Sequence, residues 1–364
     1  MRFKYHFQQK SGWINDPNGL CYYNGLYHAF YQHNPHSPQW DKMHWGHAVS
    51  RDLIEWEELP IALYPDRDYE DKGGCFSGSA IEKDGKLRLF YTSVSNKYGQ
   101  TQSTAVSSDG INFIKSENNP IILRPPYEEK SENFRDPKVF YAFGAYYMVV
   151  GYGDGDMGRV LLYRSPDLTA WEYVSVVYSS DKFGGTLECP DLFPLGDKWV
   201  LMFPAMKPTV CATVFVLGAF DGKTFAPQGE VYSEYGQDFY APQTLLAPNG
   251  ERVMIGWFYH WGKPLPSGET VAGALSIPRV LTLKDNKIFN FPVLPAQKLL
   301  VSEYEYVKID GLTVTVLGLD GKPIYQKSLV GLVDKIDKVD ILFDEKAVEI
   351  FINNGEISIS QWLI

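Results

Sequence analysis

A pattern that recurs five times constrains the fold of this chain more than any other feature of its sequence. Each copy is a tight turn followed by a strand rich in aromatic and β-branched residues. The turns lie at Asn24-Gly25, Asp84-Gly85, Phe143-Gly144, Gly196-Asp197 and Asn249-Gly250. Successive turns are separated by 60, 59, 53 and 53 residues. Because short alternating runs predominate and helical periodicity is scarce, the sequence predicts an all-β fold.

A second pattern runs in phase with the first. In it, an aspartate that follows a serine by two residues precedes an aromatic residue by four. The copies are Ser50, Asp52 and Trp56; Ser107, Asp109 and Phe113; Ser165, Asp167 and Trp171; and, more weakly, Asp221 and Phe225. Two markers with one period indicate a single structural unit, and a unit of about 55 residues with about four strands is typical of a propeller blade. We therefore expect a five-bladed β-propeller; a β-sandwich would also be all-β but would not explain the repeat.

The repeat stops near Pro295, and residues 301–364 alternate in strand fashion without continuing it. We expect a propeller domain over residues 1–295 and a short β module over residues 296–364. The module contains no new acidic residue next to a proline, so its expected role is structural.

Three acidic residues occupy equivalent places in the repeat, each one or two residues before a proline. They are Asp16, Asp136 and Glu188, and each precedes the turn of its own copy. The strand before that turn is expected to be the innermost strand of its blade, where an edge position tolerates proline. Innermost strands converge on the propeller axis, so the three carboxyl groups should meet at the mouth of the central channel.

Three carboxyl groups at one site suit hydrolysis of a glycosidic bond, which needs a proton donor and a carboxylate on opposite sides of the sugar. Glu188 has the longer reach and a small uncharged neighbour in Cys189. Asp16 lies beside Asn15 and Asn18, whose amides would keep it ionised. These settings favour Glu188 as acid/base and Asp16 as nucleophile. Arg135, next to Asp136, could form a structural salt bridge or contact the substrate.

The segments WINDPNGL, FRDPKVF and ECPDLF closely resemble the three acidic motifs of glycoside hydrolase family 32. HWGHAVSRDLIEW, FSGSA, DFYAPQT and SIPRVLTL resemble further motifs of this family, in the same order. The resemblance implies a five-bladed propeller, retention of configuration and a site built for fructose. It implies Asp16 as nucleophile, Glu188 as acid/base and Asp136 as transition-state stabiliser. Residues expected to line the pocket are Asn15, Gln32, Trp40, Phe76, Ser77, Arg135, Tyr240 and Trp257.

The chain departs from the family at its C-terminal end, where too few residues remain for two complete sheets. We expect a small, truncated β-sandwich-like module, which could consist of a single sheet. A single sheet would expose an apolar face, so a homodimer formed through the module is a hypothesis.

The net charge of −10 argues against nucleic acid or an anionic membrane as partner. No apolar segment of the signal-peptide type follows Met1 to His6, and Cys21, Cys75, Cys189 and Cys211 are scattered without a C-x-x-C pair. We therefore expect a cytoplasmic protein with free thiols. No motif requires a metal or another cofactor. His44 and His47 should face opposite ways in a strand, and Asp154-Gly155-Asp156 should form a turn.

The expected activity is release of fructose from the non-reducing ends of sucrose and short fructo-oligosaccharides. Hydrolysis of sucrose 6-phosphate is an alternative that needs a cation near the leaving glucose, for which Lys42, Lys97 and Lys207 are candidates. Transfer of fructose to another sugar and inverting cleavage of arabinosides are further enzymatic alternatives, although the WINDPNGL motif argues against the latter. A catalytically silent, fructan-binding propeller is the alternative from a different class.

Overall fold

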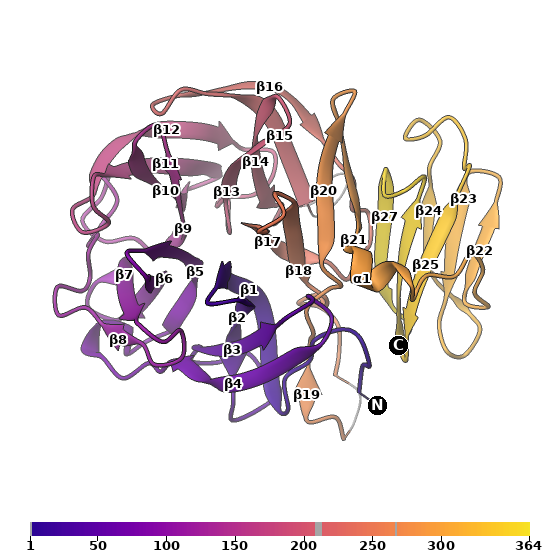
Figure 1. Cartoon of the computed structure of the whole chain (residues 1–364), viewed down its shortest axis with the longest axis horizontal. Helices are drawn as coiled ribbons and strands as arrows, with labels where there is room; N and C mark the ends of the chain where they lie inside the picture. The colour runs from indigo at the N-terminus through magenta and orange to yellow at the C-terminus, as the bar shows by residue number, and fades with distance from the viewer. Residues whose placement is uncertain (1, 208–212, 266–267) are drawn as a thin grey trace.

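The computed structural model describes residues 2–207, 213–265 and 268–364. In these ranges the chain forms a five-bladed β-propeller followed by a small two-sheet β module (Figure 1). The predicted all-β class and the propeller are confirmed. In each blade, successive strands of the chain lie side by side, as expected for a repeated unit.

The first three blades have the following strands. Blade one contains β1 (Gly12–Tyr23), β2 (Leu26–Asn34), β3 (His44–Ser50) and β4 (Trp56–Leu63). Blade two contains β5 (Gly74–Lys83), β6 (Lys86–Ser95), β7 (Gly99–Ser107) and β8 (Ile114–Lys115), preceded by the short helix η1 (Asp68–Glu70). Blade three contains β9 (Phe134–Ala142), β10 (Ala145–Asp154), β11 (Met157–Ser165) and β12 (Glu172–Ser180).

The last two blades complete the ring. Blade four contains β13 (Asp191–Leu195), β14 (Lys198–Pro204), β15 (Thr213–Phe220) and β16 (Phe225–Val231). Blade five contains β17 (Tyr240–Leu246), β18 (Arg252–Trp257), β20 (Arg279–Lys284) and β21 (Lys287–Pro292). The short strand β19 (Val271–Ala272) leaves blade five and pairs with β1 in parallel, which ties the last blade to the first.

Both repeated sequence patterns have a local structural cause. The turns at Asn24-Gly25, Asp84-Gly85 and Phe143-Gly144 have positive φ at both central residues, the geometry that joins tightly paired antiparallel strands. The Ser and Asp side chains of the second pattern accept hydrogen bonds from backbone N–H groups at the turn before the outermost strand. In the first copy, Leu53 N–H donates to Ser50 Oγ (2.8 Å) and Glu55 N–H donates to Asp52 Oδ1 (2.8 Å). Asp154-Gly155-Asp156 lies at the β10–β11 turn, as predicted.

The apolar residues of the strands pack between neighbouring blades. Phe30 and Trp45 of blade one pack with Leu87, Leu89 and Tyr91 of blade two. Similar clusters join blades two and three, three and four, and four and five. Each blade packs one face of its sheet against the preceding blade and the other face against the next blade. The central strands therefore bury apolar residues on both faces. His47 is part of this packing, stacked on Phe30 with ring centroids 4.1 Å apart.

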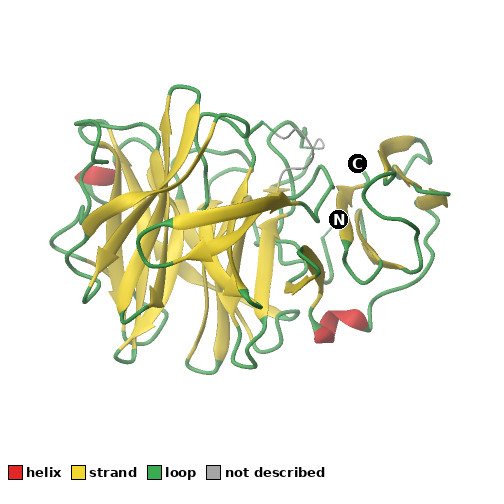
Figure 2. Cartoon of the chain, turned by 90° about the horizontal axis from the view of Figure 1, so that it is seen from above, coloured by secondary structure: helices red, strands yellow, loops and turns green. Residues whose placement is uncertain are grey.

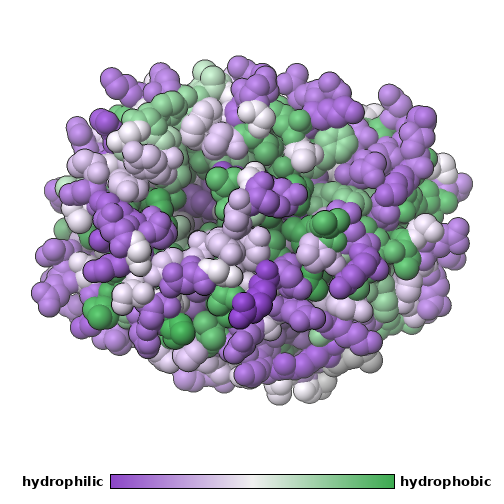
Figure 3. Space-filling model, viewed as in Figure 1, coloured by the Kyte–Doolittle hydropathy of each residue, from purple (hydrophilic) through white to green (hydrophobic). Residues whose placement is uncertain are grey.

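The innermost strands are β1, β5, β9, β13 and β17, and they carry or directly follow the prolines noted in the sequence. Their pairing is interrupted by bulges, for example between Ile14 and Pro17 in β1. Blade two has Gly78 at the equivalent position, where a Cβ atom would come within 2.0 Å of Phe90 O. Bulges re-aim side chains at strand edges. The space-filling view shows a hollow near the axis on which these strands converge (Figure 3).

The C-terminal module contains two three-stranded sheets, so the expectation of a single sheet was wrong. One sheet contains β22 (Val307–Asp310), β23 (Thr313–Leu317) and β24 (Pro323–Ser328). The other contains β25 (Val339–Asp344), β26 (Ala347–Ile352) and β27 (Ile357–Trp362). Strands of only four to six residues let both sheets fit into this short segment.

The inner sheet of the module is covered on both faces. Ile350 and Ile352 of β26 pack with Val314 and Val316 of the outer sheet, whereas Phe351 belongs to a cluster with propeller residues. The apolar face that a single sheet would have exposed is therefore buried. The module lies beside the propeller, connected to it through the short helix α1 (Leu294–Gln297) (Figure 2). This helix spans the predicted domain boundary, which stays a prediction.

Buried ion pairs hold the N-terminal segment, the propeller and the module together. His6 Nδ1 lies 2.9 Å from Asp344 Oδ2, and His6 Nε2 lies 3.3 Å from Glu349 Oε1. Arg279 of blade five reaches Glu234 Oε2 at 2.5 Å and Glu349 Oε2 at 3.2 Å. We call these five residues the junction network. All five side chains are completely buried. Within the described ranges, no helix is long and apolar enough to cross a membrane.

Candidate active site

The three predicted acids come together at one end of the propeller axis. Asp16 lies on β1 and Asp136 on β9, while Glu188 lies three residues before β13 begins. Cys189 connects them, because its Sγ lies 3.7 Å from Asp16 Oδ2 and 3.5 Å from Asp136 Oδ2. Its backbone N–H also donates to Asp136 Oδ2 (2.8 Å). Sequence reasoning identified the acids but not this contact.

Backbone strain helps to aim these groups. Asp136 and Cys189 have φ values of 68° and 43°, in the left-handed region that non-glycine residues seldom adopt. A bulge in β9 places Asp136 and its proline opposite a single residue of β10. This bulge allows Arg135 and Asp136, which a regular strand would send to opposite faces, to approach the same site. Strain of this kind often occurs at functional sites.

Asp16 is held by two hydrogen-bond donors. Asn15 Nδ2 donates to its Oδ1 (2.9 Å), and Ser77 Oγ donates to its Oδ2 (2.5 Å). Burial raises the pKa of Asp16, these two donors oppose that rise, and the negative charge of Glu188 adds to it. The carboxylate is therefore fixed in orientation while it remains crowded by other acids.

Asp136 is 5% exposed, and burial raises its pKa to about 7. The positive charge of Arg135 opposes this rise, whereas the charges of Glu188 and Asp16 add to it. Like charges that share a small site disfavour simultaneous ionisation. Near neutral pH, the cluster therefore holds a proton that it can share.

Glu188 is held on both carboxyl oxygens. Arg135 donates to Oε1 through Nε (3.1 Å) and Nη2 (3.0 Å), and the Tyr240 hydroxyl donates to Oε2 (2.7 Å). Burial and the charge of Glu188 raise the pKa of Tyr240 well above its usual value, so it stays a donor. Of the two alternatives left open for Arg135, the salt bridge is present, and its partner is the predicted acid/base.

The remaining predicted pocket residues contact the segments that precede Ser77 and Asn15. Gln32 is buried and donates to Cys75 O (3.0 Å), the residue before Phe76. Trp40 is 46% exposed and packs edge-on against Phe76 with ring centroids 5.9 Å apart. Trp257 is fully buried against Trp13 and presents no exposed face, so its contact with substrate stays a prediction.

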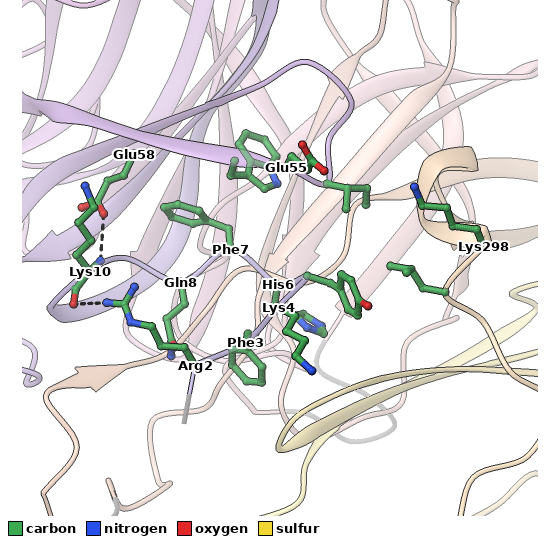
Figure 4. A pocket seen from close by; sticks show the side chains of 14 residues that line it. Arg2, Phe3, Lys4, His6, Phe7, Gln8, Lys10, Glu55, Glu58 and Lys298 are labelled. Atoms are coloured by element: carbon green, nitrogen blue, oxygen red, sulfur yellow. Dashed lines mark hydrogen bonds between the residues drawn. The ribbon is translucent and has the colours of Figure 1, made fainter.

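Other polar groups do not join this site. A separate cavity of about 470 Å³ lies against the N-terminal segment, between the β3–β4 connection and the residues after α1 (Figure 4). Its charged groups are partly paired, because Lys10 N–H donates to Glu58 Oε2 (3.1 Å) and Arg2 donates to Lys10 O (Figure 4). It contains none of the predicted site residues. Among the described residues, no group of three or more His, Cys, Asp or Glu is arranged to hold a metal.

Comparison with known proteins identifies a family. Residues 6–292 match the model of the glycosyl hydrolases family 32 N-terminal domain. A sucrose-6-phosphate hydrolase from Escherichia coli is 40% identical over 316 residues, covering 81% of this chain and 65% of that protein. A sucrose-6-phosphate hydrolase from Bacillus subtilis is 31% identical over 98% of this chain and 87% of that protein. The chain spans slightly less than two thirds of the first of these relatives.

The structural match covers the module as well as the propeller. A family 32 β-fructofuranosidase from Bombyx mori superposes with a TM-score of 0.86 at 31% sequence identity, over 100% of this chain and 89% of that protein. A variant of the same silkworm protein was solved in complex with sucrose. The matched family model covers most of the chain. This chain is a member of glycosyl hydrolase family 32.

Proposed function

We propose that this chain is a retaining β-fructofuranosidase that releases fructose from the non-reducing ends of sucrose and short fructo-oligosaccharides. The observation that carries the proposal is a pair of neighbouring carboxyl groups, at the mouth of the channel, that have different hydrogen-bond donors. Asp16 is oriented by Asn15 and Ser77, and Glu188 by Arg135 and Tyr240. A retaining glycosidase needs one carboxylate that attacks and one carboxylic acid that donates a proton.

In the proposed reaction, Asp16 attacks the anomeric carbon of the fructosyl unit while the bond to the leaving oxygen breaks. Glu188 gives its proton to that oxygen, so the leaving sugar departs neutral. Glu188 then takes a proton from water, the water attacks the fructosyl–enzyme ester, and Asp16 is released. Two displacements restore the original configuration. Asp136 hydrogen-bonds the fructosyl hydroxyls and stabilises the positive charge that develops on the fructosyl ring in the transition state of each step.

The test is a substrate panel of sucrose, 1-kestose, inulin and levan with the parent protein and the Asp16→Asn variant. We expect fructose from sucrose and kestose with the parent, and no measurable release with the variant. Asp154→Asn is the matched control, because Asp154 is an exposed carboxylate at the β10–β11 turn. Sugar binding without any release by the parent would favour a silent, fructan-binding propeller. Oligosaccharide products longer than the substrate would indicate fructosyl transfer.

Sucrose 6-phosphate is the second candidate substrate, because two of the relatives are named sucrose-6-phosphate hydrolases. Three lysines were predicted as candidates to bind the phosphate. Lys42 precedes Met43, whose backbone forms hydrogen bonds with Gly73 and Cys75. This pairing places Lys42 close in the chain to the contact between Trp40 and Phe76. Lys97 instead lies over the Tyr98 ring, 4.6 Å from its centroid. Comparing kcat/KM for the two sugars in the parent and in Lys42→Gln tests this candidate. A preference for the phosphorylated sugar that Lys42→Gln abolishes would support it.

The cellular location and assembly belong to the same proposal. We propose a cytoplasmic protein, supported by the free thiols of Cys21, Cys75 and Cys189; Cys211 lies outside the described residues. Cell fractionation tests the location. The homodimer hypothesis now depends on exposed apolar residues of the module such as Ile309, Ile324 and Val330. Light scattering that gives a monomer at every concentration would exclude it.

A further inference from the structure

Blade two supplies none of the three acids, but its side chains hold the innermost strand of blade three. That strand, β9, pairs with β10 on one side only, so the backbone groups along its other edge need partners from elsewhere. Five of these groups bond to side chains of blade two. They are Phe134 N–H to Gln100 Oε1 (2.9 Å), Phe134 O from Gln102 Nε2 (2.8 Å), Asp136 N–H to Thr92 Oγ1 (2.9 Å), Pro137 O from Ser79 Oγ (2.7 Å) and Val139 N–H to Ser79 Oγ (2.9 Å). Blade two therefore determines where this edge of β9 lies.

Three of these side chains form one buried chain of hydrogen bonds. Gln100 and Gln102 are two residues apart on β7 and point to the same face, and Thr92 lies opposite Gln102 in the β6–β7 pairing. Gln100 is 6% exposed, and the other two are completely buried. Thr92 Oγ1 donates to Gln102 Oε1 (2.8 Å), so the hydroxyl is oriented to accept the N–H of Asp136. Each member thus fixes the direction of the next hydrogen bond.

This chain ends at the residues that carry charge at the mouth. Gln100 Oε1 also accepts a hydrogen bond from Arg135 Nη1 (3.1 Å), and Arg135 in turn binds Glu188. Thr92 holds the backbone of Asp136, whose φ of 68° is a strained conformation for a residue other than glycine. Strained backbone persists only where its surroundings fix it. The hydrogen bonds from blade two are such surroundings.

We propose that Gln100, Gln102 and Thr92 are positioning residues for the reaction at the mouth. Acting from inside blade two, they set the place of Arg135 and Asp136. This inference rests on the proposed function and adds residues to it. Because Asp136 stabilises the transition state in that proposal, its displacement lowers kcat more than it raises KM.

The kinetic test is Thr92→Val, which removes the hydroxyl and keeps a side chain of similar shape. We expect kcat for sucrose to fall about tenfold to a hundredfold, the effect of a small misplacement, with KM within about threefold of the parent. Thr92→Ser keeps the hydroxyl and should recover most of the loss. Thr101→Val is the matched control, because Thr101 lies between Gln100 and Gln102 on β7, is equally buried, and bonds instead to Ser93 Oγ (2.8 Å). Its kcat should stay within about twofold of the parent.

Hydrogen exchange provides a second test that needs no substrate. Mass spectrometry of peptides that cover residues 134–138 reports the amide of Asp136. In Thr92→Val its exchange should become about tenfold faster, the size of one lost hydrogen bond. In Thr101→Val the exchange of this segment should equal that of the parent.

A second variant tests the other end of the chain. Gln100→Met has a side chain of similar length that cannot accept the hydrogen bonds of Phe134 N–H and Arg135. It should lower kcat and speed exchange of residues 134–138 in the same way as Thr92→Val. Circular dichroism of each variant checks that the fold is retained.

The other outcomes are distinct. Equal losses of kcat in Thr92→Val and Thr101→Val would mean that blade two is only destabilised, and would overturn the inference. An unchanged kcat in Thr92→Val, or a change in KM alone, would overturn it as well. If the parent releases fructose from no sugar, the proposed function itself fails. Unchanged exchange of residues 134–138 would then overturn the positioning role separately.

Discussion

The mouth of the propeller channel and the junction with the C-terminal module each contain buried acidic residues together with an arginine, but the pKa values of their acids shift in opposite directions. The mouth has Asp16, Asp136 and Glu188 with Arg135, and the junction has Glu234, Asp344 and Glu349 with Arg279 and His6. At the mouth, burial and mutual repulsion raise the pKa of Asp16 and Asp136. At the junction, the cations overcome burial and lower the pKa of Asp344 and Glu349.

The difference lies in the donors that surround each carboxyl group. Asp344 accepts the backbone N–H groups of Lys4, Tyr5 and His6 at 2.8 to 2.9 Å as well as the His6 ring. Asp136 accepts one backbone N–H group, from Cys189. Paired acids stabilise a fold, whereas crowded and incompletely paired acids retain free acceptor sites and a proton near neutral pH. The comparison therefore assigns chemistry to the mouth and stability to the junction.

The largest expected effect separates the two regions by activity. Glu188→Gln should lower kcat for sucrose on the order of 10³-fold, because an amide cannot donate the proton to the leaving oxygen. The unfolding midpoint in urea should stay close to that of the parent. Activity within tenfold of the parent would remove Glu188 from the acid/base role.

The matching change at the junction should have the opposite outcome. Glu349→Gln leaves Arg279 and His6 without their shared carboxylate, and breaking such a buried pair costs about 3 kcal/mol. We expect this loss in the free energy of unfolding measured in urea, with kcat per folded molecule unchanged. A variant as stable as the parent would show that the junction network does not hold the module.

The pH dependence of the free energy of unfolding tests whether Asp136, at the mouth, has the raised pKa that distinguishes it from the acids of the junction. Its pKa is about 7 in the folded state and has a usual value of 3.8, so the folded protein binds more protons between these limits. Stability contributed by the protonated group is therefore lost as pH rises towards 7. Between pH 5.5 and 8, Asp136→Asn should gain about 2 kcal/mol relative to the parent. Urea unfolding of both proteins at the two pH values measures this gain, and a constant difference would contradict it.

The smallest expected effect concerns His6. Burial alone would lower its pKa, but hydrogen bonds to Asp344 and Glu349 raise it above 6.5. The stability that protonated His6 provides is complete below pH 6.5 and lost as pH rises through its folded-state pKa. His6→Gln should cost about 1 kcal/mol at pH 6 and less at pH 9. Thermal unfolding at both pH values measures the cost; the same cost at both would show that His6 acts without its charge.

The sequence alone predicted the features that depend on local chemistry. Turn residues such as Asn24-Gly25 and the Ser50/Asp52 pair recur because each blade needs the same backbone geometry, so the period indicates the fold. Asp16, Asp136 and Glu188 could be found because they occupy equivalent positions of that repeat. The module was predicted less well, since a residue count does not show how short its strands are.

Only the tertiary structure determined how these residues meet. Cys189 and Asp16 are 173 residues apart, and Tyr240 and Glu188 are 52 apart, so no local pattern indicates their contacts. The raised pKa of Asp136 depends on burial and on charges from other blades. Likewise, Trp257 and Trp261 both pack on Trp13, but only the tertiary structure shows that Trp257 is fully buried and that Trp261 is 54% exposed. Sequence specifies side chains and their local backbone, but burial and long-range proximity arise only when the blades close into a ring.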